Sequence, residues 1–172
     1  RGNASCDKRE YDRAIGDLNQ AIKLNPNYVR AYYDRGIAYG TKGETDRAIQ
    51  DFDYALKLDP KNAIALNNRG LAYRNKGESD RAIADFGEAI KLNESYAAAF
   101  YNRGNAYFDK LDYERAVADF SLAVKLDSKD SFAYHDRGIA YYEKRDYDRA
   151  IADFEAAIKI NPDSDSALNN LG

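Results

Sequence analysis

A glycine recurs at a constant interval of 34 residues along the whole chain. These glycines are Gly2, Gly36, Gly70, Gly104, Gly138 and Gly172. Other columns keep the same step, among them Tyr39, Tyr73, Tyr107 and Tyr141, and Phe52, Phe86, Phe120 and Phe154. A period of about 20–50 residues is the sequence signature of a repeat architecture, in which every unit is one small supersecondary element. The 172 residues are therefore predicted to form one array of repeated units.

Two groups of columns within residues 29–62 have the spacing of a helical face. They are Tyr32, Gly36 and Tyr39, followed by Ala48, Phe52 and Ala55, with a step of four and then of three residues in each group. Such steps place side chains on one side of an α-helix, so each unit is predicted to contain two amphipathic helices. Gly43 lies between the groups and supplies the left-handed backbone that ends the first helix. Pro60 ends the second helix, as Pro26 and Pro162 do in their own units.

Small and large residues are combined where the two helices would meet. Gly36 and Ala55 allow the backbones to approach closely, while Tyr39 and Phe52 fill the space around that contact. One helix pair cannot bury its own apolar faces, so neighbouring pairs must stack, with contacts between adjacent units only. The prediction is an all-α chain that forms a curved solenoid.

These columns resemble the tetratricopeptide repeat family. Its pattern of a large apolar residue, Gly, Tyr, Ala, an aromatic residue, Ala and Pro appears as Tyr32, Gly36, Tyr39, Ala48, Phe52, Ala55 and Pro60. The resemblance implies a single domain over residues 1–172, a right-handed superhelical solenoid of antiparallel helix pairs with four full units and a partial unit at each end. The units are 1–28, 29–62, 63–96, 97–130, 131–164 and 165–172.

Six positions depart from the family pattern. Ser5 replaces the tyrosine, Leu18 the aromatic residue, Glu94 and Ser128 the proline, and Leu111 and Arg145 the loop glycine. We expect these departures to loosen individual turns by at most about 1 kcal/mol, which leaves the repeated fold intact.

Composition argues against several classes of protein. The net charge is -3 and the basic residues are scattered, so the chain lacks the basic patch of a nucleic-acid binder. The single cysteine, Cys6, rules out an intramolecular disulfide and a Cys-x-x-Cys motif. No run approaches the roughly 20 apolar residues that span a bilayer, and nothing resembles a signal peptide. The chain has no initiator methionine, so the natural N-terminus is expected to be missing; location stays open, with the cytoplasm slightly favoured.

The recurring charges are interpreted as structural. Arg35, Arg69, Arg103 and Arg137 are each followed sixteen residues later by an aspartate, namely Asp51, Asp85, Asp119 and Asp153. These are predicted to be ion pairs within each unit. A second set is expected at a spacing of four residues on one helix, namely Arg47 with Asp51, Arg81 with Asp85, Arg115 with Asp119 and Arg149 with Asp153.

In the tetratricopeptide repeat family the first helix of each unit lines a concave groove. The resemblance places the following candidate peptide-binding residues there: Arg30, Tyr33, Asp34, Asn67, Asn68, Arg74, Tyr101, Asn102, Asn105, Phe108, Phe132, His135, Asp136 and Tyr142. Amides can pair with the backbone of an extended peptide, and aromatic rings can cover its apolar side chains.

Asn68 and Asn102 share one column, which Asn170 continues, and they look like the asparagine ladder with which the superhelix of the O-linked N-acetylglucosamine transferases holds peptide backbones. Asp34 and Asp136 interrupt this ladder, because a carboxylate accepts hydrogen bonds but cannot donate them. The acidic groove residues favour a neutral or basic partner. The scarcity of groove cations disfavours a receptor for the acidic tails of heat-shock chaperones.

The inventory of reactive groups argues against catalysis. His135 is the only histidine, so a zinc site with two histidines cannot be built, and no Gly-Lys-Ser or Gly-Lys-Thr phosphate loop occurs. Cys6 and His135 lie nearly four periods apart in a fold whose contacts join neighbours, which disfavours a Cys-His nucleophile. The chain is predicted not to be an enzyme and to need neither a metal nor a cofactor.

The predicted function is a scaffold or adaptor for protein-protein interaction that binds an extended peptide or protein segment in its groove. Two alternatives stay open. Incomplete end units would leave apolar stacking faces bare, which would allow head-to-tail homo-oligomers. The segment could also be the recruiting arm of a larger multidomain protein; neither nucleic acid nor membrane insertion is expected.

Overall fold

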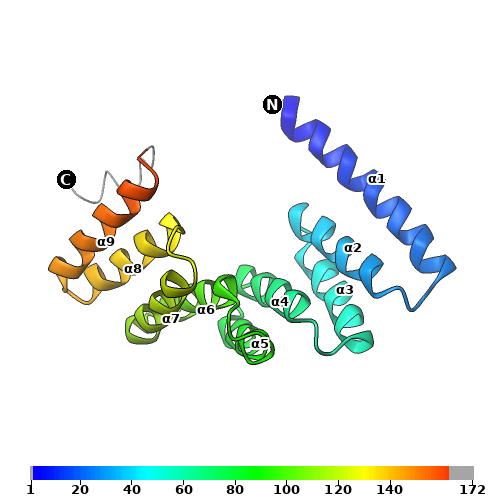
Figure 1. The fold of residues 1–172 in the computed structure, drawn as a ribbon. Coiled ribbons are helices and arrows are strands. Elements are labelled where there is room, and N and C mark those ends of the chain that lie inside the picture. Colours follow the sequence, from blue (N-terminus) through cyan, green and yellow to red (C-terminus); the bar gives the residue numbers. More distant parts are fainter. Residues whose placement is uncertain (1, 163–172) are drawn as a thin grey trace. The chain divides into compact units, whose positions relative to one another are not determined.

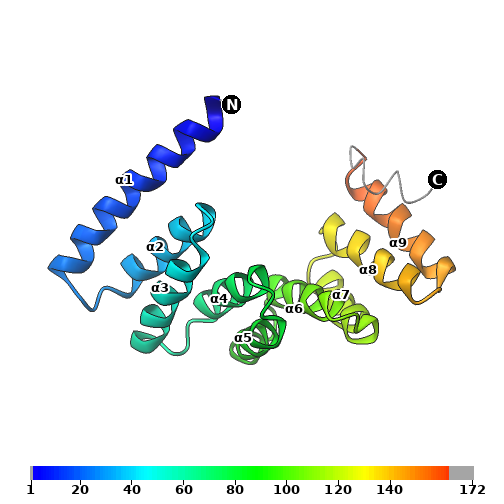
Figure 2. The same cartoon turned by 180° about the vertical axis from the view of Figure 1, so that it is seen from behind.

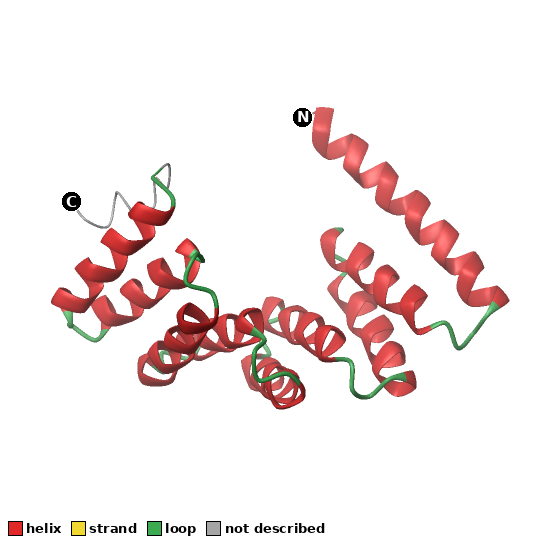
Figure 3. Ribbon diagram, viewed as in Figure 1, coloured by secondary structure: helices red, strands yellow, loops and turns green. Residues whose placement is uncertain are grey.

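The computed structural model describes residues 2–162, and these residues contain nine helices and no strand (Figure 3). The chain divides into two compact parts, Arg1–Leu92 and Asn93–Gly172, which are called the first and the second unit from here on. The 34-residue elements within them are called repeats. The first unit contains α1 (Gly2–Leu24), α2 (Val29–Thr41), α3 (Thr45–Leu58), α4 (Ala63–Asn75) and α5 (Ser79–Leu92) (Figure 1). The second contains α6 (Ala97–Asp109), α7 (Tyr113–Leu126), α8 (Ser131–Glu143) and α9 (Tyr147–Ile160).

Helices pack in consecutive antiparallel pairs, which are α2 with α3, α4 with α5, α6 with α7, and α8 with α9 (Figure 2). Within the first unit α1 also packs on α2 and α3 on α4, and within the second α7 packs on α8. The first helix of each pair begins at residue 29, 63, 97 or 131, so the 34-residue period of the sequence is also the period of the helices. The predicted all-α fold of antiparallel helix pairs is confirmed.

The turn inside each pair has one residue in the left-handed region. The φ angles are 80° at Gly43, 77° at Gly77, 60° at Leu111 and 61° at Arg145. The backbone N–H of the following residue then bonds back to the tyrosine carbonyl of the first helix, for example Glu44 N to Tyr39 O and Asp112 N to Tyr107 O, both at 2.9 Å. This closure satisfies a free carbonyl at the helix end. Leu111 and Arg145 therefore keep the turn that glycine makes elsewhere, at the steric cost of a left-handed conformation.

The second helices end at the same repeat position whether or not proline follows. Helix α3 ends at Leu58 before Pro60, and α7 ends at Leu126 although Ser128 replaces proline. The Asp127 carboxylate accepts a hydrogen bond from the N–H of Lys129 at 3.0 Å. Such a side-chain turn reverses the chain without proline, which explains why the departures from the family pattern leave the boundary in place.

Each first helix lies directly on a phenylalanine ring of its partner. A Cβ atom added to Gly70 would lie 2.7 Å from Cε1 of Phe86, a side chain that is fully buried. The corresponding values are 2.8 Å for Gly36 against Phe52, 2.8 Å for Gly104 against Phe120 and 2.7 Å for Gly138 against Phe154. Ordinary carbon contacts lie at about 3.5–4.0 Å, so only glycine fits this column.

The predicted ion pairs between the two helices of each repeat are confirmed. Arg35 donates from Nε and Nη2 to the two carboxylate oxygens of Asp51 at 2.7 and 2.6 Å. The same contact joins Arg69 to Asp85, Arg103 to Asp119 and Arg137 to Asp153. Hydrogen bonding to the carboxylate raises the pKa of these arginines. The arginine column is thus a structural clamp.

The second set of predicted ion pairs is wrong. The arginines of the second helices pair instead with the acid three residues before them, in the pairs Arg47 with Glu44, Arg81 with Glu78, Arg115 with Asp112 and Arg149 with Asp146. The aspartates of the predicted pairs are buried and already hold the arginine of the first helix. The exposed arginines turn the other way and lie over tyrosine rings, as Arg81 does over Tyr73 at 3.9 Å.

The N-terminal end of the chain differs from the full repeats. Helix α1 continues through residues 8–10, which correspond to the loop of the later repeats. Position 9 holds arginine, but Arg145 turns at the corresponding place, and we have no physical account of the difference. The expected final repeat, 165–172, and Asn170 lie outside the described residues. Head-to-tail assembly, which involves these ends, stays a prediction.

Candidate functional site

The candidate groove residues all lie on the first helices of the pairs. Helix α2 carries Arg30, Tyr33 and Asp34, α4 carries Asn67, Asn68 and Arg74, α6 carries Tyr101, Asn102, Asn105 and Phe108, and α8 carries Phe132, His135, Asp136 and Tyr142. Within each unit a hydrogen bond between neighbouring first helices brings two of them together.

On α2 the charged candidates pair with each other. Arg30 donates from Nε to both carboxylate oxygens of Asp34, at 2.8 and 2.9 Å, one helical turn away. This hydrogen bond raises the pKa of Arg30, whose guanidinium also lies 5.8 Å from the centre of the Tyr33 ring. The negative charge of Asp34 is therefore balanced locally.

The amides of α4 have structural partners. The Asn68 side chain donates from Nδ2 to the hydroxyl of Tyr33 at 2.8 Å, a bond between two consecutive repeats. The pKa of Tyr33 is raised, chiefly because its ring is partly buried. Asn67 is buried at 4% exposure, and Arg74 is half-buried. Of the two asparagines, only Asn68 is placed at the surface.

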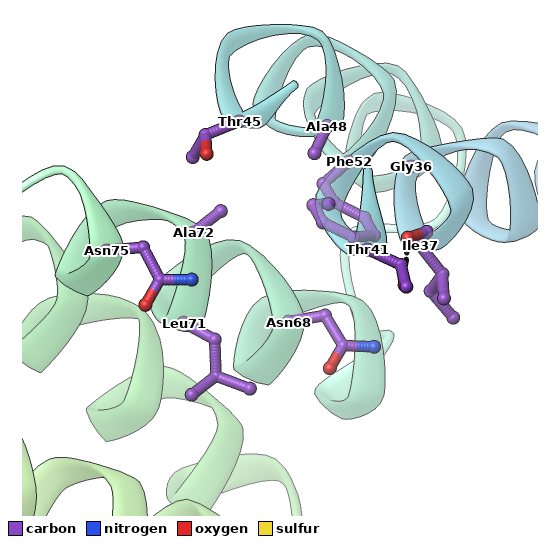
Figure 4. Close-up of a pocket in the computed structure, with 11 residues that line it drawn as sticks. Gly36, Ile37, Thr41, Thr45, Ala48, Phe52, Asn68, Leu71, Ala72 and Asn75 are labelled. Carbon is purple, nitrogen blue, oxygen red and sulfur yellow. Dashed lines mark hydrogen bonds between the residues drawn. The ribbon is translucent and has the colours of Figure 1, made fainter. Parts of the chain in front are cut away.

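A pocket of about 190 Å³ opens between α2, the start of α3 and α4 (Figure 4). Ala48, Phe52 and Ala72 form its buried apolar walls. The other lining residues are Gly36, Ile37, Gly40, Thr41, Thr45, Asn68, Leu71 and Asn75. In Figure 4 the Asn68 side chain of α4 points toward Thr41 and Ile37 of α2, while Thr45 of α3 lies above Asn75. Amide and hydroxyl groups thus surround an apolar interior.

In the second unit three candidates form one hydrogen-bonded group. The Tyr101 hydroxyl donates to Oδ2 of Asp136 at 2.6 Å, and Nδ1 of His135 lies 3.0 Å from Oδ1 of the same carboxylate. The pKa of Tyr101 is raised by burial and by this hydrogen bond, which stabilises the neutral phenol. Both carboxylate oxygens of Asp136 are therefore engaged.

Aromatic side chains cover the end of each first helix in the second unit. The half-buried Phe108 meets Tyr113 edge to face with centroids 5.2 Å apart, and Tyr142 meets Tyr147 likewise at 5.5 Å. Phe132 is 67% exposed at the start of α8. The neighbouring amides differ in access, because Asn105 is half-buried whereas Asn102 is only 9% exposed. Asn102, one of the expected ladder positions, is thus buried, and the asparagine ladder stays a prediction.

Of the residues that line the pocket, only Asn68 was a sequence candidate, and the residues that were missed include Gly40 and Thr45. The sequence signal that could have identified Gly40 and Thr45 is a change in side-chain size between equivalent positions of different repeats. Position 40 corresponds to Phe108 and Tyr142, and position 45 to Tyr113 and Tyr147. The α2–α3 repeat thus has small residues where the α6–α7 and α8–α9 repeats have aromatic rings, while the α4–α5 repeat has Arg74 and Ser79 at these positions.

The described residues, 2–162, offer neither a cluster of metal ligands nor a membrane-spanning helix. That part of the chain contains no group of three or more His, Cys, Asp or Glu side chains that could hold a metal ion. None of its helices is long and apolar enough to cross a membrane.

Family profiles of tetratricopeptide repeats match nearly the whole chain. One TPR repeat profile matches residues 2–43 and 70–110, and two tetratricopeptide repeat profiles match 33–86, and 97–130 with 131–164. The chain belongs to the tetratricopeptide repeat family. A comparison with curated protein sequences gave no significant match.

Solved structures of tetratricopeptide repeat proteins share the fold. A crystal structure of MamA has a TM-score of 0.84 and 27% identity, with 94% of each chain covered. YrrB, described as a TPR protein with an unusual peptide-binding site, has a TM-score of 0.79 and 24% identity over 94% of this chain and 84% of its own. The first TPR of Spaghetti (RPAP3), bound to the HSP90 peptide SRMEEVD, has a TM-score of 0.63 and 28% identity over 66% of this chain and 90% of its own.

Proposed function

We propose that this tetratricopeptide repeat chain is a scaffold that holds a protein or peptide segment against the first helices of its repeats. The RPAP3 repeat, which is 28% identical over 66% of this chain, is bound to a peptide. The family likeness supports an interaction module, and the proposal assigns the chain no reaction, metal or cofactor.

The observation that carries this proposal is the pocket of the first unit. Asn68 and Asn75 lie about two turns apart on α4 and flank Leu71, while Ile37 and Thr41 of α2 lie opposite Asn68 (Figure 4). An amide offers both a donor and an acceptor, which suits the alternating N–H and C=O groups of an extended backbone. Apolar walls between such amides suit one side chain of the same segment.

The partner is proposed to be neutral or basic. Arg30 balances Asp34, whereas the uncharged Tyr101 hydroxyl that donates to Asp136 does not cancel the charge of that carboxylate, which disfavours an acidic segment. The SRMEEVD peptide bound by RPAP3 is acidic at its end. A clamp for such a peptide needs several cations, and Arg30, one of the two groove arginines, already pairs with Asp34.

A selection from a displayed library of random nine-residue peptides tests the proposal. The double variant Asn68→Ala with Asn75→Ala is expected to bind the selected peptides about tenfold more weakly, because two net hydrogen bonds are lost. The matched control is Gln20→Ala with Gln50→Ala, which removes two exposed amides from α1 and α3. Circular dichroism should show equal helicity in both variants. Failure to select any peptide, or equal affinity of the two variants, would contradict the proposal.

A further inference from the structure

The second unit fills the equivalent of the first unit's pocket with one of its own side chains. Phe108 lies 68 residues after Gly40, which is two repeat periods. Its ring packs against the buried cluster of Ala116, Phe120 and Ala140. The residues 68 positions before that cluster are Ala48, Phe52 and Ala72, the buried walls of the pocket. A phenylalanine ring therefore occupies in the second unit the space that is open in the first.

The neighbouring position shows the same exchange. Tyr113 supports the Phe108 ring with an interplanar angle of 61°, and its counterpart in the first unit is Thr45, which lines the pocket. With Gly40 and Thr45 the first unit lacks both aromatic rings, whereas the buried wall residues are identical in the two units. The pocket therefore lies where the second unit has an aromatic side chain, but positions 40 and 45 of the first unit carry no aromatic residue.

Size and chemistry agree with a phenyl ring. The volume is about 190 Å³, and a cavity of about 150 Å³ lined by Leu, Ile and Phe is enough to bind benzene. The buried walls, Ala48, Phe52 and Ala72, present only hydrocarbon side chains. A polar group placed against them would lose its hydrogen bonds to water, which favours phenylalanine over more polar side chains.

We propose that this pocket binds the phenyl ring of a phenylalanine residue in the partner segment, in place of the ring that Phe108 supplies in the second unit. The proposal rests on the scaffold function and names the side chain that the first unit selects. Asn68 and Asn75 at the rim would hold the backbone on either side of that phenylalanine.

The test fills the pocket from within. A Cβ atom added to Gly40 would lie 3.8 Å from Cβ of Ala48, an ordinary contact, and Gly40 is helical, so Gly40→Phe can restore the ring without disturbing the fold. The matched control is Gly16→Phe, because Gly16 is also helical and nothing lies within 4 Å of its added Cβ. The probes are N-acetyl-phenylalanine methylamide and N-acetyl-alanine methylamide, titrated into the ¹⁵N-labelled chain and followed by NMR.

We expect the phenylalanine probe to shift the amide signals of Thr45, Leu71 and Ala72 in the wild type and in Gly16→Phe, with affinity at least about tenfold above that of the alanine probe. Gly40→Phe should abolish these shifts. Equal shifts with both probes, shifts that persist in Gly40→Phe, or no shifts at all would overturn the inference.

The peptide selection separates this inference from the scaffold function. Selected peptides should be enriched in phenylalanine for the wild type, and Gly40→Phe should lose that enrichment. Peptides that bind without phenylalanine would refute the inference and leave the scaffold function standing. Phenylalanine-probe binding without any selected peptide would refute the scaffold function alone.

Discussion

Substitution of alanine for Gly70 tests the central packing contact of the repeat. The added Cβ would lie 2.7, 2.9 and 3.0 Å from three atoms of the Phe86 ring, which is fully buried. Because ordinary contacts lie at about 3.5–4.0 Å, the ring and the helix have to separate by roughly 1 Å. Overpacking of this kind costs about 1–3 kcal/mol.

Helix propensity acts in the opposite direction. Alanine is favoured over glycine within a helix by about 1 kcal/mol, so the net effect of Gly70→Ala is a loss of up to about 2 kcal/mol in the free energy of unfolding, with a midpoint of about 1 kcal/mol. Gly16→Ala isolates the propensity term, since nothing lies within 4 Å of its added Cβ. That variant should gain about 0.5–1 kcal/mol. The two glycine substitutions should therefore change stability in opposite directions.

Urea denaturation followed by circular dichroism measures both changes. Repeat arrays can unfold in more than one step, so the shift of the transition that includes α4 and α5 is the quantity to compare. Phe86→Leu in the Gly70→Ala background should recover part of the loss, because a smaller side chain relieves the contact. The reasoning fails if Gly70→Ala is as stable as the wild type, or if Gly16→Ala is destabilised to the same degree.

Three further predictions concern single positions. Leu111→Gly should stabilise the fold by about 0.5–1 kcal/mol in urea, because φ is 60° at a side chain that is 70% exposed; a loss of stability would refute this. The pKa of Asp112 is lowered, first by its side-chain hydrogen bond from Arg115, so its contribution to stability is present above about pH 4 and is lost as pH falls through the folded-state pKa. Carboxyl ¹³C NMR should show that Arg115→Ala raises this pKa, and an unchanged value would count against the contact. The raised pKa of Tyr101 means a contribution that is present below about pH 10 and is lost as pH rises further; ultraviolet titration should show an earlier ionisation in Asp136→Asn, and no change would exclude a role for that carboxylate.

The sequence predicts the helix pairs well because their constraints are local and repeated. Glycine beneath a phenylalanine ring recurs in all four full repeats, and glycine in the left-handed turn recurs in two of them, so the period shows both. The ion pair between Arg35 and Asp51 is predictable for the same reason, since it recurs at a constant separation.

Partners on alternative sides of one helix are harder to predict. Arg47 has an acid three residues before it and another four residues after it, and spacing alone permits either pairing. The choice depends on burial, because Asp51 faces inward and is held by Arg35. Burial of a particular carboxylate follows from tertiary packing, which the pattern of charges does not contain.

The candidate site was predicted only in outline. The sequence places Asn68 on the correct helix, but its bond to Tyr33 joins residues 35 positions apart and could not be read from its own column. The pocket was missed because Gly40 and Thr45 contribute by being small. A sequence pattern shows which side chains are present, whereas a cavity depends on how side chains from several helices pack around an empty space.

Tyr33 and Tyr101 make the contact between the two first helices of their own unit tolerant of changes in sequence. The Tyr33 hydroxyl accepts a hydrogen bond from the amide of Asn68, whereas the Tyr101 hydroxyl donates one to the carboxylate of Asp136. A hydroxyl can do either because its hydrogen rotates about the C–O bond. Exchange of asparagine and aspartate in the next repeat therefore reverses the direction of the bond without breaking it. Successive repeats can change the charge of their surface in this way while their helices stay joined.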